Sequence, residues 1–319
     1  MRTPNKRRVA RLLVTGCGVA LSLAAPTWRV AREPGDGCWP PRCQDGQVPL
    51  ATPVIAHGDR LFMIGDGAAP NQAYESLDGT TWRGFTHDAS WGKRYKAADA
   101  SYAGALWRVG GWTEDDGRRT AMNDVWRSED GRRWHRILSQ APWLPRSGAH
   151  LVVLRDTLWL VGGEPNEQAV WLTTDGRNWS KRVTSALPRA NPHSVVAYRD
   201  ALWIIGHGEW DSATNDVWTS ADGASWKQVT RAAEWPVRTG AGVAVLDDRL
   251  LVVAGVGRRD VWSSTDGRKW QNIGAELPGP PRGAEYSVVF KNAYWVYGGK
   301  TGGLGGTGFW DGVSYLAMR

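Results

Sequence analysis

The stretch Ser76-Leu77-Asp78-Gly79-Thr80-Thr81-Trp82 recurs along the chain and determines the fold. Four further copies occur at 128–134, 173–179, 220–226 and 264–270, so the aspartates of successive copies are 44 to 52 residues apart. A weaker sixth copy at 311–315 has Tyr315 in place of the tryptophan. Asp-Gly favours tight hairpin turns because both residues tolerate a positive φ, which gives this recurrence a structural explanation.

A second motif repeats with the same period, an apolar stretch that ends in small residues, as in Leu106-Trp107-Arg108-Val109-Gly110-Gly111. Its other copies lie at 61–65, 158–163, 202–206, 250–255 and 294–299. An apolar segment precedes each copy, and a Val-Trp pair follows four of them. Four short strands in each such period are typical of a β-propeller blade. We therefore predict an all-β chain, a six-bladed β-propeller with four antiparallel strands per blade over residues 50–319.

The two motifs together resemble the kelch family of propellers, whose blades carry a Gly-Gly pair after the second strand and a tryptophan farther along. The resemblance covers about residues 50–316 and implies a kelch-type propeller of the galactose oxidase kind. The Asp-Gly segments resemble more weakly the Asp-boxes of sialidases, which have one more residue between Asp and Gly. Either residues 315–318 complete the last blade, or a strand at 47–51 completes it and joins the two ends of the chain.

The first 25 residues have the pattern of a signal peptide. Five basic residues precede an apolar run from Leu12 to Ala25, which is short for a membrane span and ends in small residues. We expect cleavage near Ala24 or Ala25 and an exported, periplasmic or secreted protein. Val14-Thr15-Gly16-Cys17 also resembles a bacterial lipobox, so lipidation at Cys17 is the one route by which we expect a membrane association.

A short leader at 26–49 contains the two remaining cysteines, Cys38 and Cys43. An even pair in an exported chain predicts a disulfide bond between them. The net charge of +7 derives mainly from the signal segment, because 34 basic and 32 acidic residues remain without its first 24 residues. This balance argues against nucleic acid as a partner. The six histidines have no metal-ligand spacing, and we predict no metal, no cofactor and a monomer.

Thirteen of the 21 tryptophans occupy repeat positions, which predicts that they form the core rather than a binding surface. An arginine also recurs at the start of the first strand in five repeats. Near it lie further polar or aromatic residues, so these side chains are our candidates for a ligand-binding site at one mouth of the central channel. The candidate residues are Arg94, Arg146, Arg189, Arg238, Arg282, His150, His193, Tyr286, Glu285 and Asp99.

Several guanidinium groups at one mouth would favour a carboxylate or phosphate ligand. We therefore expect a non-catalytic propeller that binds an acidic glycan or an acidic protein segment, and some kelch domains that bind acidic peptides use arginines at this position. The alternative for these arginines is structural pairing with Asp124, Asp216 and Asp260, which precede the Val-Trp pairs.

Two tryptophans, Trp112 and Trp210, fall outside the repeat pattern in the variable loops that follow the second strand. They would either stack on a ligand or anchor their own loops. The residue types at the channel mouth also fit an enzyme that acts on an acidic sugar, similar to the kelch mutarotase of sialic acid or to a sialidase. That enzyme is the second functional hypothesis, and the sequence does not assign its catalytic residues.

Overall fold

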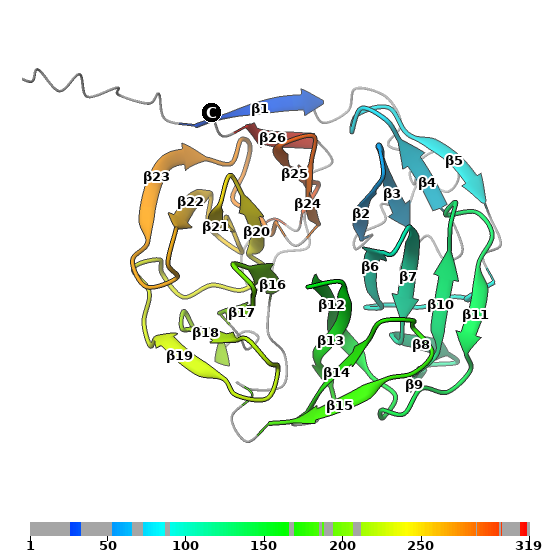
Figure 1. Ribbon diagram of the computed structural model, residues 1–319. Coiled ribbons are helices and arrows are strands. Elements are labelled where there is room, and N and C mark those ends of the chain that lie inside the picture. Colours follow the sequence, from blue (N-terminus) through cyan, green and yellow to red (C-terminus); the bar gives the residue numbers. More distant parts are fainter. Residues whose placement is uncertain are drawn as a thin grey trace, which may run out of the picture.

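The computed structural model describes residues 26–32, 53–65, 73–86, 90–165, 169–184, 187, 194–206, 212–284, 286–299, 301 and 313–317. Within these residues six four-stranded antiparallel sheets surround a central axis, as Figure 1 shows. An all-β propeller with four-stranded antiparallel sheets is therefore confirmed. The expected signal segment (1–25) and both leader cysteines, Cys38 and Cys43, lie outside the described residues.

Five sheets are each formed by one continuous stretch of chain, with their strands in sequence order from the inside outward. The first sheet contains β2 (Val54–His57), β3 (Arg60–Ile64), β4 (Ala73–Ser76) and β5 (Arg83–Thr86), and the second contains β6 (Ala98–Tyr102), β7 (Ala105–Val109), β10 (Val125–Ser128) and β11 (His135–Leu138). The third contains β12 (Ser147–Leu154), β13 (Thr157–Glu164), β14 (Ala169–Thr173) and β15 (Ser180–Val183). The fourth contains β16 (Val195–Tyr198), β17 (Ala201–Ile205), β18 (Val217–Ser220) and β19 (Lys227–Thr230), and the fifth β20 (Gly242–Leu246), β21 (Arg249–Val253), β22 (Asp260–Ser264) and β23 (Gln271–Glu276).

The sixth sheet joins the two ends of the chain. Its inner strands are β24 (Ser287–Phe290), β25 (Ala293–Tyr297) and β26 (Val313–Ala317), and β1 (Thr27–Arg32) pairs with β26 as the outermost strand. Trp28 packs edge-to-face on Tyr294, with ring centres 6.4 Å apart. β1 belongs to the segment that the sequence assigned to the leader, and it joins the two ends of the chain as one alternative expected of a strand at 47–51, a segment that lies outside the described residues.

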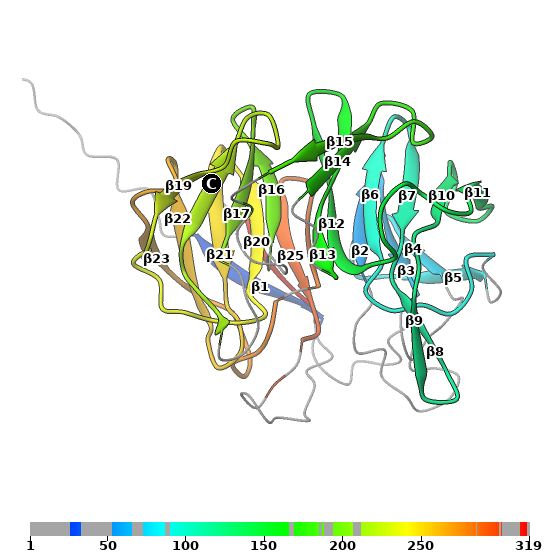
Figure 2. The ribbon, with the colours of Figure 1, turned by 90° about the horizontal axis from the view of Figure 1, so that it is seen from below.

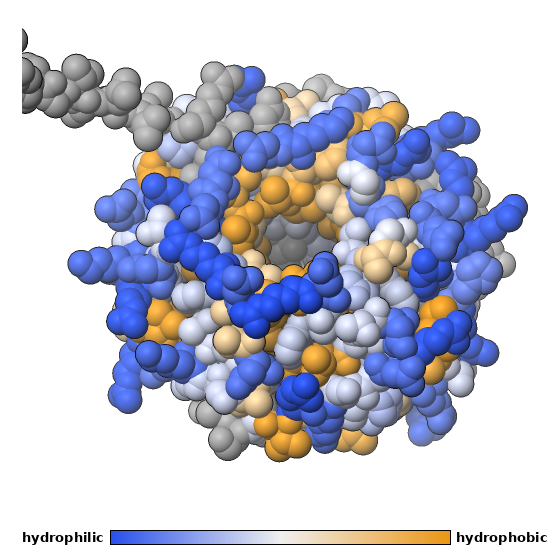
Figure 3. Space-filling view, viewed as in Figure 1, coloured by the Kyte–Doolittle hydropathy of each residue, from blue (hydrophilic) through white to orange (hydrophobic). Residues whose placement is uncertain are grey.

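The innermost strands form the wall of the central channel. They neighbour one another in the order β2, β6, β12, β16, β20 and β24, and β24 in turn contacts β2, so the ring is closed. Figure 3 shows a central hollow with hydrophobic residues in its wall. Hydrophobic clusters fill the spaces between neighbouring sheets, as with Trp107 and Val109 of the second sheet and Leu158 and Leu160 of the third.

The repeated Asp-Gly motif forms the turn between the third and fourth strands, as its sequence predicts. In the fourth sheet Asp222 Oδ1 accepts the N–H groups of Ala224 (2.9 Å) and Ser225 (2.7 Å), and Ser220 Oγ accepts that of Gly223 (2.9 Å). These N–H groups hold the pKa of the Asp222 carboxyl down, at about 2. The motif tryptophan, Trp226, donates its indole N–H to the Gly223 carbonyl (3.1 Å).

The repeat tryptophans form the core, as expected. Nine of the 13 are buried and the other four are half-buried. Trp107, Trp203 and Trp295 each donate the indole N–H to a carbonyl five residues earlier, at the end of the first strand. No helix among the described residues is long and apolar enough to cross a membrane.

Candidate functional site

The two ends of the propeller differ in their connections. At one end, which we call the loop face, the chain enters each innermost strand and leaves each second strand. At the other end, the turn face, two-residue turns such as Arg155-Asp156 join the first and second strands, with positive φ at both residues. The recurring arginines belong to the loop face.

Arg94 illustrates the contacts that these arginines make. Its side chain is buried, and Nη1 and Nη2 bind the two carboxylate oxygens of Asp124 at 2.8 and 2.9 Å. Arg94 also donates to the carbonyls of Gly110 (2.9 Å) and Trp91 (3.2 Å from Nε). The guanidinium therefore joins the start of the innermost strand to the end of the second strand and to the start of the third.

Arg238 repeats this arrangement in the fifth sheet. It binds both oxygens of Asp260 at 2.7 and 3.0 Å and donates to the Ala254 carbonyl at 2.7 Å. Trp262 donates its indole N–H to the same carboxylate. Burial tends to raise the pKa of Asp260, but the hydrogen bonds from Arg238 and Trp262 outweigh it and keep the pKa below its ordinary value.

Arg146 and Arg282 are buried as well and also donate to backbone carbonyls. Arg146 donates to Leu144 (3.2 Å) and Gly162 (3.1 Å), and Arg282 to Gly298 (2.9 Å) and Pro280 (3.4 Å). In each of the four described cases, one carbonyl acceptor lies 16 residues after the arginine. These four guanidinium groups hold the loops of the propeller together, and for Arg94 and Arg238 the contacts are the structural pairing with Asp124 and Asp260 that the sequence left open as the alternative to a binding mouth.

The remaining candidates have varied positions. His150 and Tyr286 are half-buried, on β12 opposite Val161 and just before β24 respectively. Tyr286 packs in the cluster that joins the sixth and first sheets. The other four candidates, Arg189, His193, Glu285 and Trp210, lie outside the described residues. The described residues contain no group of histidine, cysteine and acidic side chains that would hold a metal ion.

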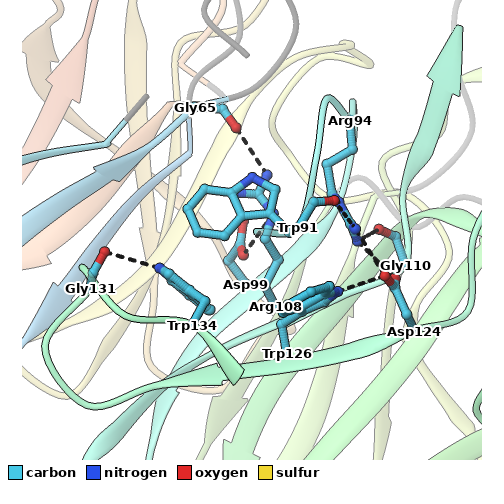
Figure 4. A network of polar contacts seen from close by, with 10 residues as sticks. All are labelled: Gly65, Trp91, Arg94, Asp99, Arg108, Gly110, Asp124, Trp126, Gly131 and Trp134. Carbon is cyan, nitrogen blue, oxygen red and sulfur yellow. Dashed lines mark hydrogen bonds and ion pairs between the residues drawn. The ribbon is translucent and has the colours of Figure 1, made fainter. Parts of the chain in front are cut away.

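Asp99 lies in the junction between the first and second sheets, opposite Arg108 on the neighbouring strand (Figure 4). Their side chains are 3% and 0% exposed, and Arg108 Nε lies 3.7 Å from Asp99 Oδ1. Arg108 donates from Nη2 to the Gly65 carbonyl (3.2 Å) and lies over the ring of Trp91. Burial raises the pKa of the Asp99 carboxyl above its ordinary value, against the opposing effect of Arg108 and Arg94.

The same pair of positions is uncharged in every other sheet. The equivalent cross-strand pairs are Val54 with Met63, Leu151 with Leu160, Val195 with Ile204, Val243 with Val252 and Ser287 with Val296. Asp99 was a sequence-based candidate because of its place near the expected channel mouth, whereas Arg108 was not among the candidates. The signal was present, because Arg108 is the one charged residue in a register otherwise filled by apolar side chains.

A hairpin of strands β8 (Trp112–Asp115) and β9 (Arg118–Ala121) follows the second strand of the same sheet, and Figure 2 shows it extending beyond the body of the propeller. Trp112 stacks on Tyr95, with ring centres 4.3 Å apart, and Arg119 lies 4.5 Å from the Trp112 ring centre. Backbone hydrogen bonds in both directions join Tyr95 to Trp112. Trp112 thus anchors the base of the hairpin, which is one of the two roles that its sequence position allowed.

Three further tryptophans, Trp91, Trp143 and Trp235, occupy a repeat position that sequence analysis overlooked. Each lies three residues before a recurring arginine, is buried, and packs against the tryptophan of an Asp-Gly motif. The Trp-x-x-Arg spacing was the available signal. These indoles therefore belong to the structural core of the loop face.

The fold and the loop-face arrangement define a β-propeller domain whose second sheet carries an added hairpin. Residues 129–297 match the family described as the DUF6242 beta propeller domain, and the chain belongs to that family. A solved structure described as that of YjhT is similar in fold, with a TM-score of 0.69, 18% sequence identity, and coverage of 85% of this chain and 96% of that chain. No curated protein gives a significant sequence match to the chain.

Proposed function

We propose that this chain is a non-catalytic binding propeller that recognises an acidic protein segment at the base of the β8–β9 hairpin. The observation that carries the proposal is the coincidence of two departures from the repeat in one sheet: the projecting hairpin and the charged Asp99–Arg108 pair. Variable loops on a regular scaffold are where binding specificity is normally found. A projecting hairpin is convex, which suits a protein partner better than a small ligand, since small ligands bind in concave sites.

The charge of this region supports an acidic partner. Lys93 and Lys96 are exposed on either side of Tyr95, which stacks on the hairpin base. On the hairpin Glu114 is paired with Arg119 (3.2 Å) and Asp115 lies opposite Arg118, while the exposed Asp116 is in the turn at the tip, the end of the hairpin farthest from its base. Exposed lysines beside an aromatic stack would attract carboxylates and accelerate association with an acidic segment.

A titration with a labelled hexaglutamate peptide tests this function. We expect the chain from Thr27 onward to bind it in a salt-sensitive manner, and the double charge reversal Lys93→Glu/Lys96→Glu to weaken binding by about tenfold or more, about 1.4 kcal/mol. Arg249→Glu, at an exposed residue beside a turn of the turn face, is the matched control and should bind as the parent does. Equal binding of hexaglutamate by the parent and the double variant would contradict the proposal.

An enzyme that acts on an acidic sugar is the second candidate. The observation that favours it is the Asp99 carboxyl, whose pKa is raised and which lies beside Arg108, the residue types needed for proton transfer and carboxylate binding. The near-complete burial of both side chains makes binding the better-supported function. Mutarotation of an acidic sugar, followed by NMR and abolished in Asp99→Asn, would reverse this order.

We further propose that the six sheets are six blades of kelch type and that the chain is exported. β1 begins at Thr27, just after the expected cleavage sites at Ala24 and Ala25, so removal of the signal would leave the closing strand intact. N-terminal sequencing of the exported protein tests this proposal. A first residue beyond Thr27, or a lipidated Cys17, would contradict cleavage at these sites.

A further inference from the structure

The junction between the first and second sheets is polar where the corresponding junctions are largely apolar. Asp99 and Ser101 alternate with buried alanines along β6, and Ser101 Oγ lies 2.8 Å from His57 Nδ1 on β2. Asp99 and Arg108 occupy the register position that four other sheets fill with two apolar side chains. Burying a charged pair costs free energy unless its remaining hydrogen-bonding groups are satisfied.

The Asp99 carboxylate lacks hydrogen-bond donors in the part of the chain that the structure describes. Neither Oδ1 nor Oδ2 is exposed, and neither has a hydrogen-bond partner among those residues. The separation of 3.7 Å between Oδ1 and Arg108 Nε is an ion pair but exceeds hydrogen-bond length. A buried acceptor left without a donor destabilises the folded state, and such groups are rare in native proteins unless water or another bound molecule donates a hydrogen bond to them.

The indole of Trp91 lies on the other side of Arg108, with the guanidinium carbon 5.1 Å from the ring centre. Its Nε1–H also lacks an acceptor, but so do those of Trp143 and Trp235 at the equivalent positions. The indole is therefore a common feature of the repeat and carries no argument by itself. What distinguishes the first junction is the carboxylate, which needs hydrogen-bond donors.

We propose that ordered water occupies this junction and donates hydrogen bonds to Asp99. The molecule in this junction must donate hydrogen bonds to a carboxylate, which excludes simple anions. It must also be neutral, because the charge of Asp99 is balanced by Arg108, while Arg94 is already balanced by Asp124. It must be small, because the side chains of Asp99 and Arg108 are only 3% and 0% exposed and Trp91 beside them is 3% exposed. Water meets all three conditions, and buried waters typically bridge two to four such polar groups.

A crystal structure of the chain from Thr27 onward tests this inference directly. We expect at least one ordered water at about 2.6–3.2 Å from an Asp99 carboxylate oxygen, with a second partner on the protein. The inference is overturned if Asp99 is instead bonded directly to Arg108 with no water in contact, or if a larger molecule or an ion occupies the site. None of these outcomes depends on the proposed partner of the hairpin.

Thermal unfolding provides a second test that does not need crystals. The double variant Asp99→Val/Arg108→Ile reproduces the Val195–Ile204 pair of the fourth sheet and removes the groups that would bind the water. Its melting temperature should be no lower than that of the parent. Arg108→Ile alone leaves a buried carboxylate without its counter-charge and should melt several degrees lower. The reverse exchange, Val195→Asp/Ile204→Arg, should lower the melting temperature strongly because the fourth sheet has no hydrated site for the pair. Equal losses in the double variant and in Arg108→Ile would overturn the inference.

Discussion

Gly176 lies against the indole of Trp107 in the preceding sheet, so closely that a Cβ atom at residue 176 would be 2.0 Å from Trp107 Cζ3. The same contact recurs between Gly223 and Trp159 and between Gly267 and Trp203. The glycine of the Asp-Gly turn is thus required by its positive φ and also by packing between sheets. The tryptophan of one repeat and the glycine of the next form one structural unit.

Gly176→Ala should therefore destabilise the protein more than its backbone conformation alone requires. The matched control is Gly117→Ala at the hairpin tip, because Gly117 has a similar φ (74° against 71°) and no atom within 4 Å of the position that a Cβ would take. We expect a loss of about 1–2 kcal/mol for Gly117→Ala and about 1–3 kcal/mol more for Gly176→Ala. Urea unfolding measures both, and equal losses would contradict the packing role.

Arg238→Met should destabilise the loop face. The substitution leaves Asp260 without its bidentate partner and the Ala254 carbonyl without a donor, and breaking such a buried pair costs about 3–5 kcal/mol. Arg258→Met, at an exposed arginine of a nearby loop, is the control and should change stability by less than about 0.5 kcal/mol. If the two variants unfold at the same urea concentration, Arg238 does not have the structural role assigned to it.

Removal of β1 should weaken the sixth sheet, in which the two ends of the chain meet. A chain that starts after Arg32 loses the outermost strand of the sixth sheet and the contact of Trp28 with Tyr294, and it exposes the edge of β26. Free strand edges pair with other chains, so we expect a lower melting temperature together with self-association. Differential scanning calorimetry and size-exclusion chromatography measure these effects. A truncated chain that is monomeric and as stable as the chain from Thr27 would show that closure does not depend on β1.

Stability should decrease in acid because the aspartates of the Asp-Gly turns accept backbone N–H groups with their ionised carboxylates. The pKa of Asp222 is about 2, and that of Asp78 is also about 2 because backbone N–H groups outweigh the effect of burial. Since the folded-state pKa values lie below the ordinary value of 3.8, this stabilisation is present above about pH 4 and is lost as the pH falls towards 2. Urea midpoints at several pH values should fall less steeply in Asp222→Asn, and an unchanged slope would contradict this origin.

The repeated strands and turns could be predicted from the sequence because their signals are local. Asp222 and Gly223, for example, satisfy their turn within a few residues, so the motif appears as a short fixed pattern. The closing strand could not be predicted in the same way. Thr27–Arg32 follows the signal segment directly, and its partner β26 is nearly 300 residues away in the sequence.

The roles of the arginines also depended on contacts that the sequence does not display. Arg94 and the Gly110 carbonyl are 16 residues apart and meet only because β6 and β7 pair in one particular register. The sequence offered pairing with aspartates such as Asp124 and Asp260 as one alternative, but it did not show the backbone carbonyls that each described guanidinium also binds. The unusual environment of Asp99 could be recognised only from the pairing of β6 with β7, which places Arg108 opposite it. The equivalent pairs in four other sheets are apolar.

Hydrogen exchange measured with and without hexaglutamate peptide tests the central claim most directly, because it locates the bound surface within the intact chain. We predict slower exchange upon binding in the segment 92–97 and in the hairpin, residues 112–121, with the turn face unchanged. Slower exchange at the turns 155–156, 199–200 and 247–248 instead, or no change at a saturating peptide concentration, would contradict recognition at the hairpin base.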